Sequence, residues 1–183
     1  KGRPDSSINP TPVVGVLGVM DDVRRANPSG WFEEGLAIVA LGETRDELDG
    51  SAWARVVHDH LGGQPPRVDL EAEMALGRVL VALSEADGPD APDGGRLVRA
   101  AHDCSAGGLI QTLVDAVLRH GVGASIDLVQ LQGRDGVDDF TALLSESGAR
   151  AVVAVPEWAV AAVAAAAEAE DVAWARLGTT GGD

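Results

Sequence analysis

Residues 97–120 read LVRAAHDCSAGGLIQTLVDAVLRH, and this stretch predicts a strand, a tight turn and a helix in direct succession. The strand is predicted over Leu97–Ala101 and the helix over Leu109–His120, with a turn between them that ends in Gly107 and Gly108. The apolar face of this helix is predicted to consist of Ile110, Leu113, Val114 and Val117. A strand that leads through a glycine turn into a helix indicates a layered fold.

The same alternation extends in both directions along the chain. Apolar runs predict further buried strands at Val13–Met20, Leu36–Leu41, Ala124–Leu128, Ala151–Val155 and near Val172–Leu177. Helices are predicted from Ser51, from Asp69 to about Glu85, around Phe140–Leu144 and from Glu157. Together these elements predict a mixed β-sheet covered by helices.

Two of the predicted helices follow a residue that can cap free amides. Ser51 precedes a helix predicted to stop at Gly62, and Asp69 precedes the longer one. The apolar face of the first helix is predicted to contain Trp53, Val56, Val57 and His60. That of the second is predicted to contain Leu70, Met74, Gly77 and Val81.

Composition restricts the class of protein. The chain has 183 residues, enough for one ordinary domain, and 14 Lys and Arg against 29 Asp and Glu give a formal net charge of -15. Such a surface repels a nucleic-acid backbone, whereas a small anion can still bind at local amides. A single cysteine, Cys104, excludes an intrachain disulfide and a multi-cysteine zinc site. Short apolar runs and a polar Lys1–Pro12 segment lead us to expect a soluble cytoplasmic protein.

The turn before Leu109 carries the residues best suited to ligand chemistry. Glycines at a helix entrance let a phosphate approach the backbone amides, which makes Ser105, Gly107 and Gly108 candidate phosphate-binding residues. Asp103 is suited to hold a magnesium ion that bridges to phosphate oxygens. The alternative is a tight connection in which Asp103 or Ser105 only caps the helix. The pattern alone favours this alternative, because short glycine turns are common.

Two further segments are candidate anion sites. Gly50 and Ser51 open a helix, although a serine cap without any ligand is the commoner explanation of this pattern. Glu146 and Ser147 lie between a predicted helix and a predicted strand, where Glu146 either faces a ligand or caps a turn. The spacing of the four histidines predicts no metal cluster. Because the sequence identifies no base for Cys104, a buried thiol is predicted there.

Several of these segments resemble one known superfamily. His102–Leu109 (HDCSAGGL) resembles the His-Asp-x-Ser-x-Gly-Gly-Leu signature in the C-terminal domain of the aminoimidazole ribonucleotide (AIR) synthetase superfamily. Three other segments are similar, in the same order, to the large synthetase subunits of the phosphoribosylformylglycinamidine synthase family. They are TPVVGVLG at 11–18 with Asp22-Val23, LGET through ELDGS at 41–51, and LSES at 144–147. The similarity spans about Asn9 to Gly178.

The resemblance implies an α+β fold that is partly ferredoxin-like. It implies that residues 1–27 are the closing strand and linker of a preceding ATP-binding domain, and that residues 28–183 form the C-terminal AIR synthetase-like domain. In that family a ligase of purine biosynthesis uses ATP and Mg²⁺ to convert formylglycinamide ribonucleotide to its amidine. Its implied partners are the upstream ATP-binding domain, a glutaminase subunit that supplies ammonia and a small accessory subunit.

The resemblance also assigns roles to individual residues. Asp103 matches a magnesium ligand, and Glu146-Ser147 match two positions of a substrate-contacting Glu-Ser-Gln segment in which Gly148 replaces glutamine. This difference implies the second copy of a duplicated domain, with an auxiliary site and no catalytic residue. Because the family's ATP motif and catalytic histidine lie upstream, the chain alone is expected to be inactive.

Two alternative functions belong to other classes. In the first alternative, the chain is a domain of another superfamily member, such as a selenophosphate synthetase, a thiamine phosphate kinase or a hydrogenase-maturation protein. In the second, it is a non-catalytic scaffold that docks partner subunits. The segment Glu47–Ser51 is typical of the amidine synthases and favours the first interpretation.

Overall fold

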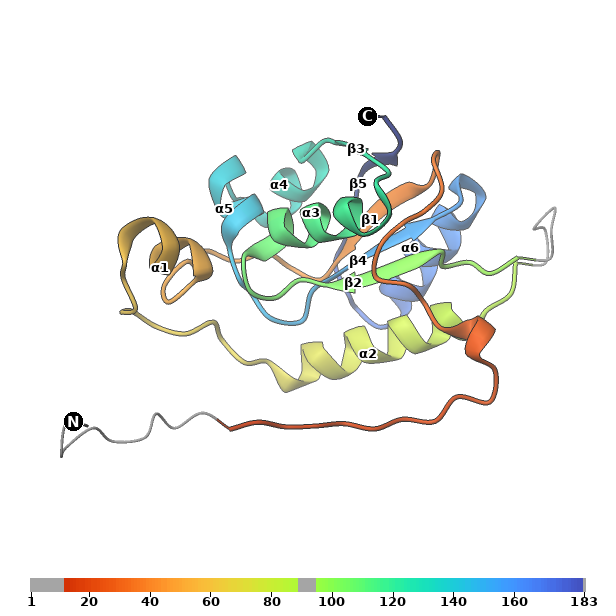
Figure 1. The fold of residues 1–183 in the computed structure, drawn as a ribbon, viewed down its shortest axis with the longest axis horizontal. Helices are drawn as coiled ribbons and strands as arrows, with labels where there is room; N and C mark the ends of the chain where they lie inside the picture. Colours follow the sequence, from red (N-terminus) through yellow and green to blue (C-terminus); the bar gives the residue numbers. More distant parts are fainter. Residues whose placement is uncertain (1–11, 89–94, 183) are drawn as a thin grey trace, which may run out of the picture.

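A computed structural model describes residues 12–88 and 95–182 of the chain. One five-stranded sheet lies between two layers of helices, as Figure 1 shows. Its strands are β1 (Ala37–Leu41), β2 (Ala100–Asp103), β3 (Ala124–Ile126), β4 (Ala151–Val155) and β5 (Trp174–Thr180). The spatial order β2-β4-β1-β5-β3 places β1 at the centre. The predicted α+β class is confirmed.

All pairings in the sheet are antiparallel. β1 pairs with β4 from Ala37 opposite Val155 to Leu41 opposite Ala151, and it pairs with β5 along its other edge. β2 pairs with β4, and β3 pairs with β5. The prediction of a mixed sheet is therefore wrong in this respect. The last two strands, β4 and β5, lie on either side of β1. They separate β1 from β2 and β3, which precede them in the sequence, and every neighbouring pair is antiparallel.

Strands β1 and β4 are buried on both faces of the sheet. Ala37, Val39 and Leu41 of β1 contribute to the core on one side of the sheet, and Ile38 and Ala40 contribute to the core on the other. Strand β4 divides in the same way, because successive side chains of a strand point to opposite faces. This explains why both strands read as continuous apolar runs, and the predicted strand at Ala151–Val155 matches β4.

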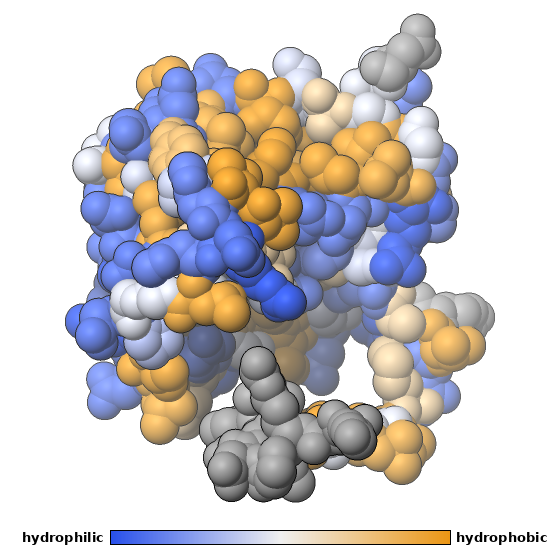
Figure 2. All heavy atoms as spheres, turned by 60° about the vertical axis from the view of Figure 1, so that its left-hand side comes forward, coloured by the Kyte–Doolittle hydropathy of each residue, from blue (hydrophilic) through white to orange (hydrophobic). Residues whose placement is uncertain are grey.

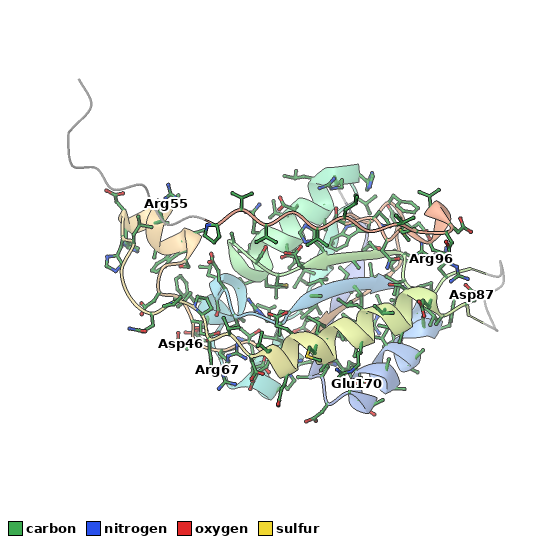
Figure 3. The ribbon with its side chains drawn as sticks, turned by 90° about the horizontal axis from the view of Figure 1, so that it is seen from below. Asp46, Arg55, Arg67, Asp87, Arg96 and Glu170 are labelled. Atoms are coloured by element: carbon green, nitrogen blue, oxygen red, sulfur yellow. The ribbon has the colours of Figure 1, made fainter. Side chains whose placement is uncertain are left out.

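One face of the sheet is covered by α2 (Leu70–Glu85) and α6 (Val160–Ala169), which follows the 3₁₀ helix η2 (Glu157–Ala159). Asp69 caps α2 as predicted, since its carboxylate accepts a bond from the amide of Ala72. The predicted apolar face of α2 is wrong. Leu70, Met74 and Val81 are exposed, and the buried side chains are Ala75, Leu76, Val79 and Leu83. Figure 3 shows Glu170, which pairs with Arg78 of α2 at 2.7 Å.

The other face is covered by α3 (Gly108–His120), α4 (Val129–Asp135) and α5 (Asp139–Leu144). In α3 the buried residues are Gly108, Leu109, Thr112, Leu113 and Ala116, so the predicted face is displaced. Ile110 and Val114 are exposed instead. Helix α4 was not predicted, because its seven residues contain only two apolar side chains, Val129 and Leu131, and of these only Leu131 is buried.

Helix α1 (Ala52–His58) protrudes at one end of the molecule, at the left of Figure 1. Ser51 caps it as predicted, because its hydroxyl accepts a bond from the amide of Ala54. The helix ends before the predicted Gly62, since Asp59 adopts a left-handed conformation with φ 49°. The predicted apolar face is wrong here too, because Val56 and Val57 are exposed and His60 lies beyond the helix.

The segment that precedes the 3₁₀ helix η1 (Val23–Arg25) differs most from expectation. Residues 13–20 were predicted to form a buried strand, but they form no regular secondary structure and their large apolar side chains are exposed. Leu17 is 94% exposed. Figures 1 and 2 show this segment standing away from the body of the molecule. Its composition favours a strand, yet the described residues offer it no neighbouring strand.

None of the helices within 12–88 and 95–182 combines the length and the apolar character needed to cross a bilayer.

Candidate functional site

The predicted glycine turn lies where β2 ends and α3 begins. Gly107 and Gly108 both have left-handed backbone conformations, with φ of 87° and 70°. A Cβ atom on Gly108 would lie 2.7 Å from the carbonyl oxygens of Leu143 and Ser145, so the turn packs directly against the end of α5. Each glycine therefore has a structural reason of its own to be there.

The two predicted amide-rich segments meet at one carboxylate. Oε1 of Glu146 accepts hydrogen bonds from the amide of Ala52, at the start of α1, and from the amide of Gly107, before α3. Both donor–acceptor distances are 2.7 Å. The sequence predicts anion-binding groups in both segments, and the structure brings them together around the protein's own carboxylate. A phosphate-binding role for Gly50, Gly107 and Gly108 stays a prediction.

The serine residues of the predicted site are occupied internally. The Ser51 hydroxyl donates to the carbonyl of Leu48 at 2.6 Å and accepts from Ala54 at 3.2 Å, and the residue is 1% exposed. Ser147 is fully buried, and its hydroxyl accepts from the amide of Arg45 at 3.0 Å. Ser105 is exposed in the turn. Of the three predicted serines, only Ser105 is positioned to meet a ligand from solvent.

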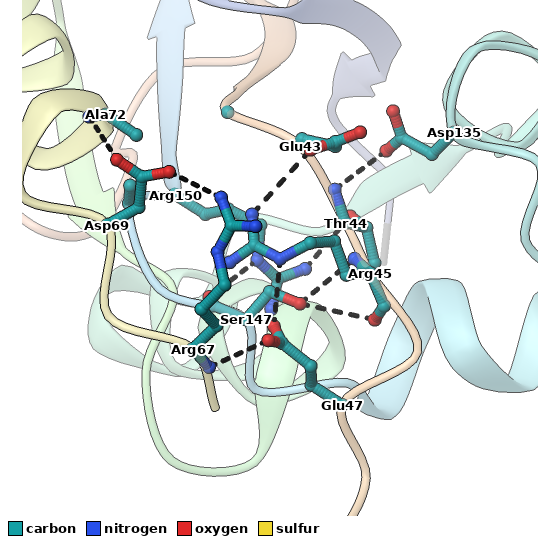
Figure 4. Close-up of polar contacts among 12 residues, drawn as sticks. Glu43, Thr44, Arg45, Glu47, Arg67, Asp69, Ala72, Asp135, Ser147 and Arg150 are labelled. Carbon is teal, nitrogen blue, oxygen red and sulfur yellow. Dashed lines mark hydrogen bonds and ion pairs between the residues drawn. The ribbon is translucent and has the colours of Figure 1, made fainter. Parts of the chain in front are cut away.

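A buried arginine organises the base of this site, and sequence analysis did not identify it. Arg150 is 5% exposed and donates to the carbonyl oxygen of Ser147 and to the hydroxyl of Thr44, 3.0 Å away (Figure 4). It also donates to the carbonyl oxygen of Ser145. Burial lowers the pKa of Arg150, but a guanidinium remains charged at neutral pH. The available signal was its position, immediately before the apolar run 151–155.

Glu47 is the centre of another group of polar contacts, which Figure 4 shows. Its carboxylate accepts from the amide of Arg67 at 2.8 Å and pairs with Arg45 Nε at 3.3 Å. Burial raises the pKa of Glu47, but the Ser147 hydroxyl, the Arg67 amide and the charge of Arg45 together outweigh this effect and lower it overall. The loop before α1 is thus fixed on both sides, by Glu47 and by Glu146.

Lowered carboxylate pKa values make acid sensitivity a testable property of the chain. The pKa values of Asp69 and Asp138 are held down by the capped amides of Ala72 and Thr141, and that of Glu47 is also lowered. Since each folded-state pKa lies below its unfolded value, the stabilisation is present above about pH 4 and is lost as pH falls through the folded-state values. We expect urea midpoints to decline as the pH falls below about 4.

Asp138→Asn provides the matched variant for this prediction, because asparagine still caps a helix but does not titrate. Its urea midpoint should decline less on acidification than that of the native chain. Equal midpoints for the native chain across the acid range would contradict the prediction.

An open hollow lies beside the glycine turn, between β2, α2 and the segment before β4. Its volume is about 560 Å³. We call it the Asp103 hollow. The polar residues that line it are Glu73, His102, Asp103, Ser105, Glu146 and Arg150. The Asp103 side chain is 74% exposed, and its Oδ1 lies 3.3 Å from His102 Nδ1. The predicted aspartate therefore faces solvent in a concavity.

Within 12–88 and 95–182, no three His, Cys, Asp or Glu side chains come together as a metal site requires. Asp103 can supply one ligand, so a magnesium ion at this position would take its other ligands from phosphate or water. Cys104 is buried as predicted, and burial raises the pKa of its thiol.

The fold and this strand–turn–helix site define the chain's family. It belongs to the AIR synthase related proteins, C-terminal domain, whose family model matches residues 33–183. Its curated relatives include phosphoribosylformylglycinamidine synthase subunit PurL of Leifsonia xyli, 55% identical over 83% of this chain, and of Thermobifida fusca, 52% identical over 97%. These alignments cover 18% and 21% of the relatives, so the chain spans about a fifth of their length.

Solved structures share the fold at lower sequence identity. PurL of Thermotoga maritima complexed with FGAR has a TM-score of 0.71 at 21% identity, over 87% of this chain and 26% of that one. The same protein complexed with ATP has a TM-score of 0.66, also at 21% identity, over 88% and 24%. Thiamine-monophosphate kinase from Stenotrophomonas maltophilia has a TM-score of 0.54 at 19% identity, over 87% and 51%.

Proposed function

We propose that this chain is the C-terminal domain of a phosphoribosylformylglycinamidine synthase subunit, which amidates formylglycinamide ribonucleotide with ATP in purine biosynthesis. The observation that supports this most strongly is sequence identity of about half over nearly the whole chain with PurL of several bacteria. The other superfamily members match at the level of the fold, as thiamine-monophosphate kinase does. Neither they nor a scaffold role is favoured by any feature of the site.

The cofactors and partners of the full-length protein follow from the same proposal. Solved structures of Thermotoga maritima PurL carry ATP or ADP, and one structure is of PurLQS. The proposed protein uses ATP with Mg²⁺, receives ammonia from a glutaminase subunit, and assembles with a small accessory subunit in the cytoplasm. Asp103 and Ser105 are the predicted residues whose exposure in the Asp103 hollow suits contact with a ligand or its metal ion.

The exposed N-terminal segment supports a proposed domain division. Residues 1–27 would complete the sheet of an upstream ATP-binding domain, and residues 28–183 would form the domain described above. The segment 13–19 contains four valines and meets no strand of the described sheet, so it is suited to pair with a sheet elsewhere in the polypeptide. The exposed Leu70, Met74 and Val81 on α2 offer that domain an apolar contact surface.

A chimera tests this function directly. The corresponding segment of Thermobifida fusca PurL is replaced by this chain, and ATP-dependent formation of the amidine is measured with ammonium as the nitrogen source. We expect the chimera to retain most of the parent activity, and the isolated chain to have none because it lacks the ATP motif. A folded chimera that is inactive, beside an active parent assayed identically, would contradict the proposal.

A further inference from the structure

The bond pattern at Glu146 resembles that of an anion-binding site with its anion already supplied. One carboxylate oxygen receives two short amide bonds, from Ala52 and Gly107, which lie 94 residues before it and 39 residues before it in the chain. Backbone amides in this arrangement are the usual ligands of phosphate and carboxylate groups. In this chain no outside molecule is needed to satisfy them.

The position of the carboxylate is fixed by its neighbours in the sequence. Ser145 and Ser147 are both fully buried, and their hydroxyl groups bond the backbone of Arg45. The amide of Glu146 donates to the carbonyl of Glu47 at 3.2 Å. With the backbone held on both sides, the side chain is directed at the two amides.

We propose that Glu146 is a positioning residue that serves as a built-in anion, joining the loop before α1 to the glycine turn and closing their amides to external phosphate. The reason is that the Glu146 carboxylate and an external anion compete for the same two amides. A tethered carboxylate is present at a high effective concentration, whereas a free anion must be bound from solution. This inference goes beyond the proposed function, because it concerns the isolated chain and holds whatever reaction the full-length protein catalyses.

The consequence for ligand binding is specific. A phosphate group that enters the Asp103 hollow would meet exposed Asp103 and Ser105, while the Ala52 and Gly107 amides are already occupied. Of the predicted phosphate-binding residues in the glycine turn, Ser105 therefore stays accessible, whereas the amide of Gly107 is occupied.

Chemical rescue distinguishes a built-in anion from an ordinary structural side chain. Glu146→Ala removes the carboxylate and leaves space for a small anion. We expect its melting temperature to fall by about 3 to 10 °C, because two partly buried amides lose their acceptor. Sodium formate at roughly 100 mM should recover much of this loss, compared with sodium chloride at equal ionic strength, by binding the folded state.

Glu73→Ala is the matched control. Glu73 also lines the hollow and accepts one backbone amide bond, from Ala149 at 2.8 Å, but it is exposed and holds a single amide. Formate should give this variant no more protection than it gives the native chain. Glu146→Gln keeps an acceptor oxygen without the charge, so it should lose less stability than Glu146→Ala and gain little from formate.

Two results would overturn the inference. The first is a Glu146→Ala variant that formate stabilises no more than it stabilises Glu73→Ala, or that remains unfolded in formate as it does in chloride. The second is measured on the native chain, by titration with inorganic phosphate and observation of amide NMR signals. Saturating shifts at Ala52 and Gly107 would mean that these amides are open to external anions.

Discussion

Replacing Arg150 with alanine is expected to reduce the free energy of unfolding by on the order of 3 to 5 kcal/mol. The reason is that removal of the buried guanidinium leaves three acceptors without their donor. The acceptors are the carbonyl oxygens of Ser145 and Ser147 and the hydroxyl of Thr44. These bonds hold the segment that positions Glu146, so the loop around Thr44 should lose protection in hydrogen exchange together with the glycine turn. Urea unfolding followed by circular dichroism measures the change.

The matched control for Arg150→Ala is Arg78→Ala. Arg78 forms an ion pair with Glu170 at 2.7 Å, but its side chain is 53% exposed, so its removal should change stability by less than about 1 kcal/mol. Arg150→Lys should lie between the two, because an ammonium group cannot replace the planar fork of a guanidinium. A loss at Arg150→Ala as small as that at Arg78→Ala would show that the buried bonds contribute little.

Gly108→Ala has the second largest expected effect, a loss on the order of 2 to 4 kcal/mol. The new Cβ would sit 2.7 Å from two backbone carbonyl oxygens, in a residue whose φ of 70° is unfavourable for alanine. Backbone atoms cannot turn aside as the end of a side chain can, so α5 or α3 must shift. Thermal unfolding of the variant should reveal a lower midpoint.

Gly77→Ala is the corresponding control. Gly77 lies in α2, where an added Cβ atom would meet no other part of the molecule within 4 Å, and alanine favours a helix more than glycine does. This variant should therefore be more stable than the native chain, by up to about 1 kcal/mol. If Gly108→Ala unfolds at the same urea concentration as the native chain, the close approach between the glycine turn and α5 is not a constraint.

Local sequence signals predicted the elements that carry their own information. The run 151–155 predicts β4 because five apolar residues between Arg150 and Pro156 suit a strand buried on both faces. Ser51 and Asp69 predict two helix starts because capping depends on residues only three positions apart. These features need no knowledge of the rest of the chain.

The failures concern properties set by distant partners. Residues 13–20 have the composition of a buried strand, but burial requires a neighbour that the described residues do not provide. In α2, apolar residues occur on more than one face, so the sequence could not identify which of them faces the sheet. The same is true of the site. The two amide-bearing segments and Glu146 were each predicted as candidates, whereas their meeting at one carboxylate oxygen depends on closure of the whole fold.

The position of β1 at the centre of the sheet also constrains the order of folding. Its partners, β4 and β5, begin at Ala151 and Trp174, more than a hundred residues later in the chain. During synthesis, β1 therefore cannot pair with its two neighbouring strands until β4 and β5 have also left the ribosome. Contacts this distant in sequence slow folding, so assembly of this domain is a late event that depends on its C-terminal end.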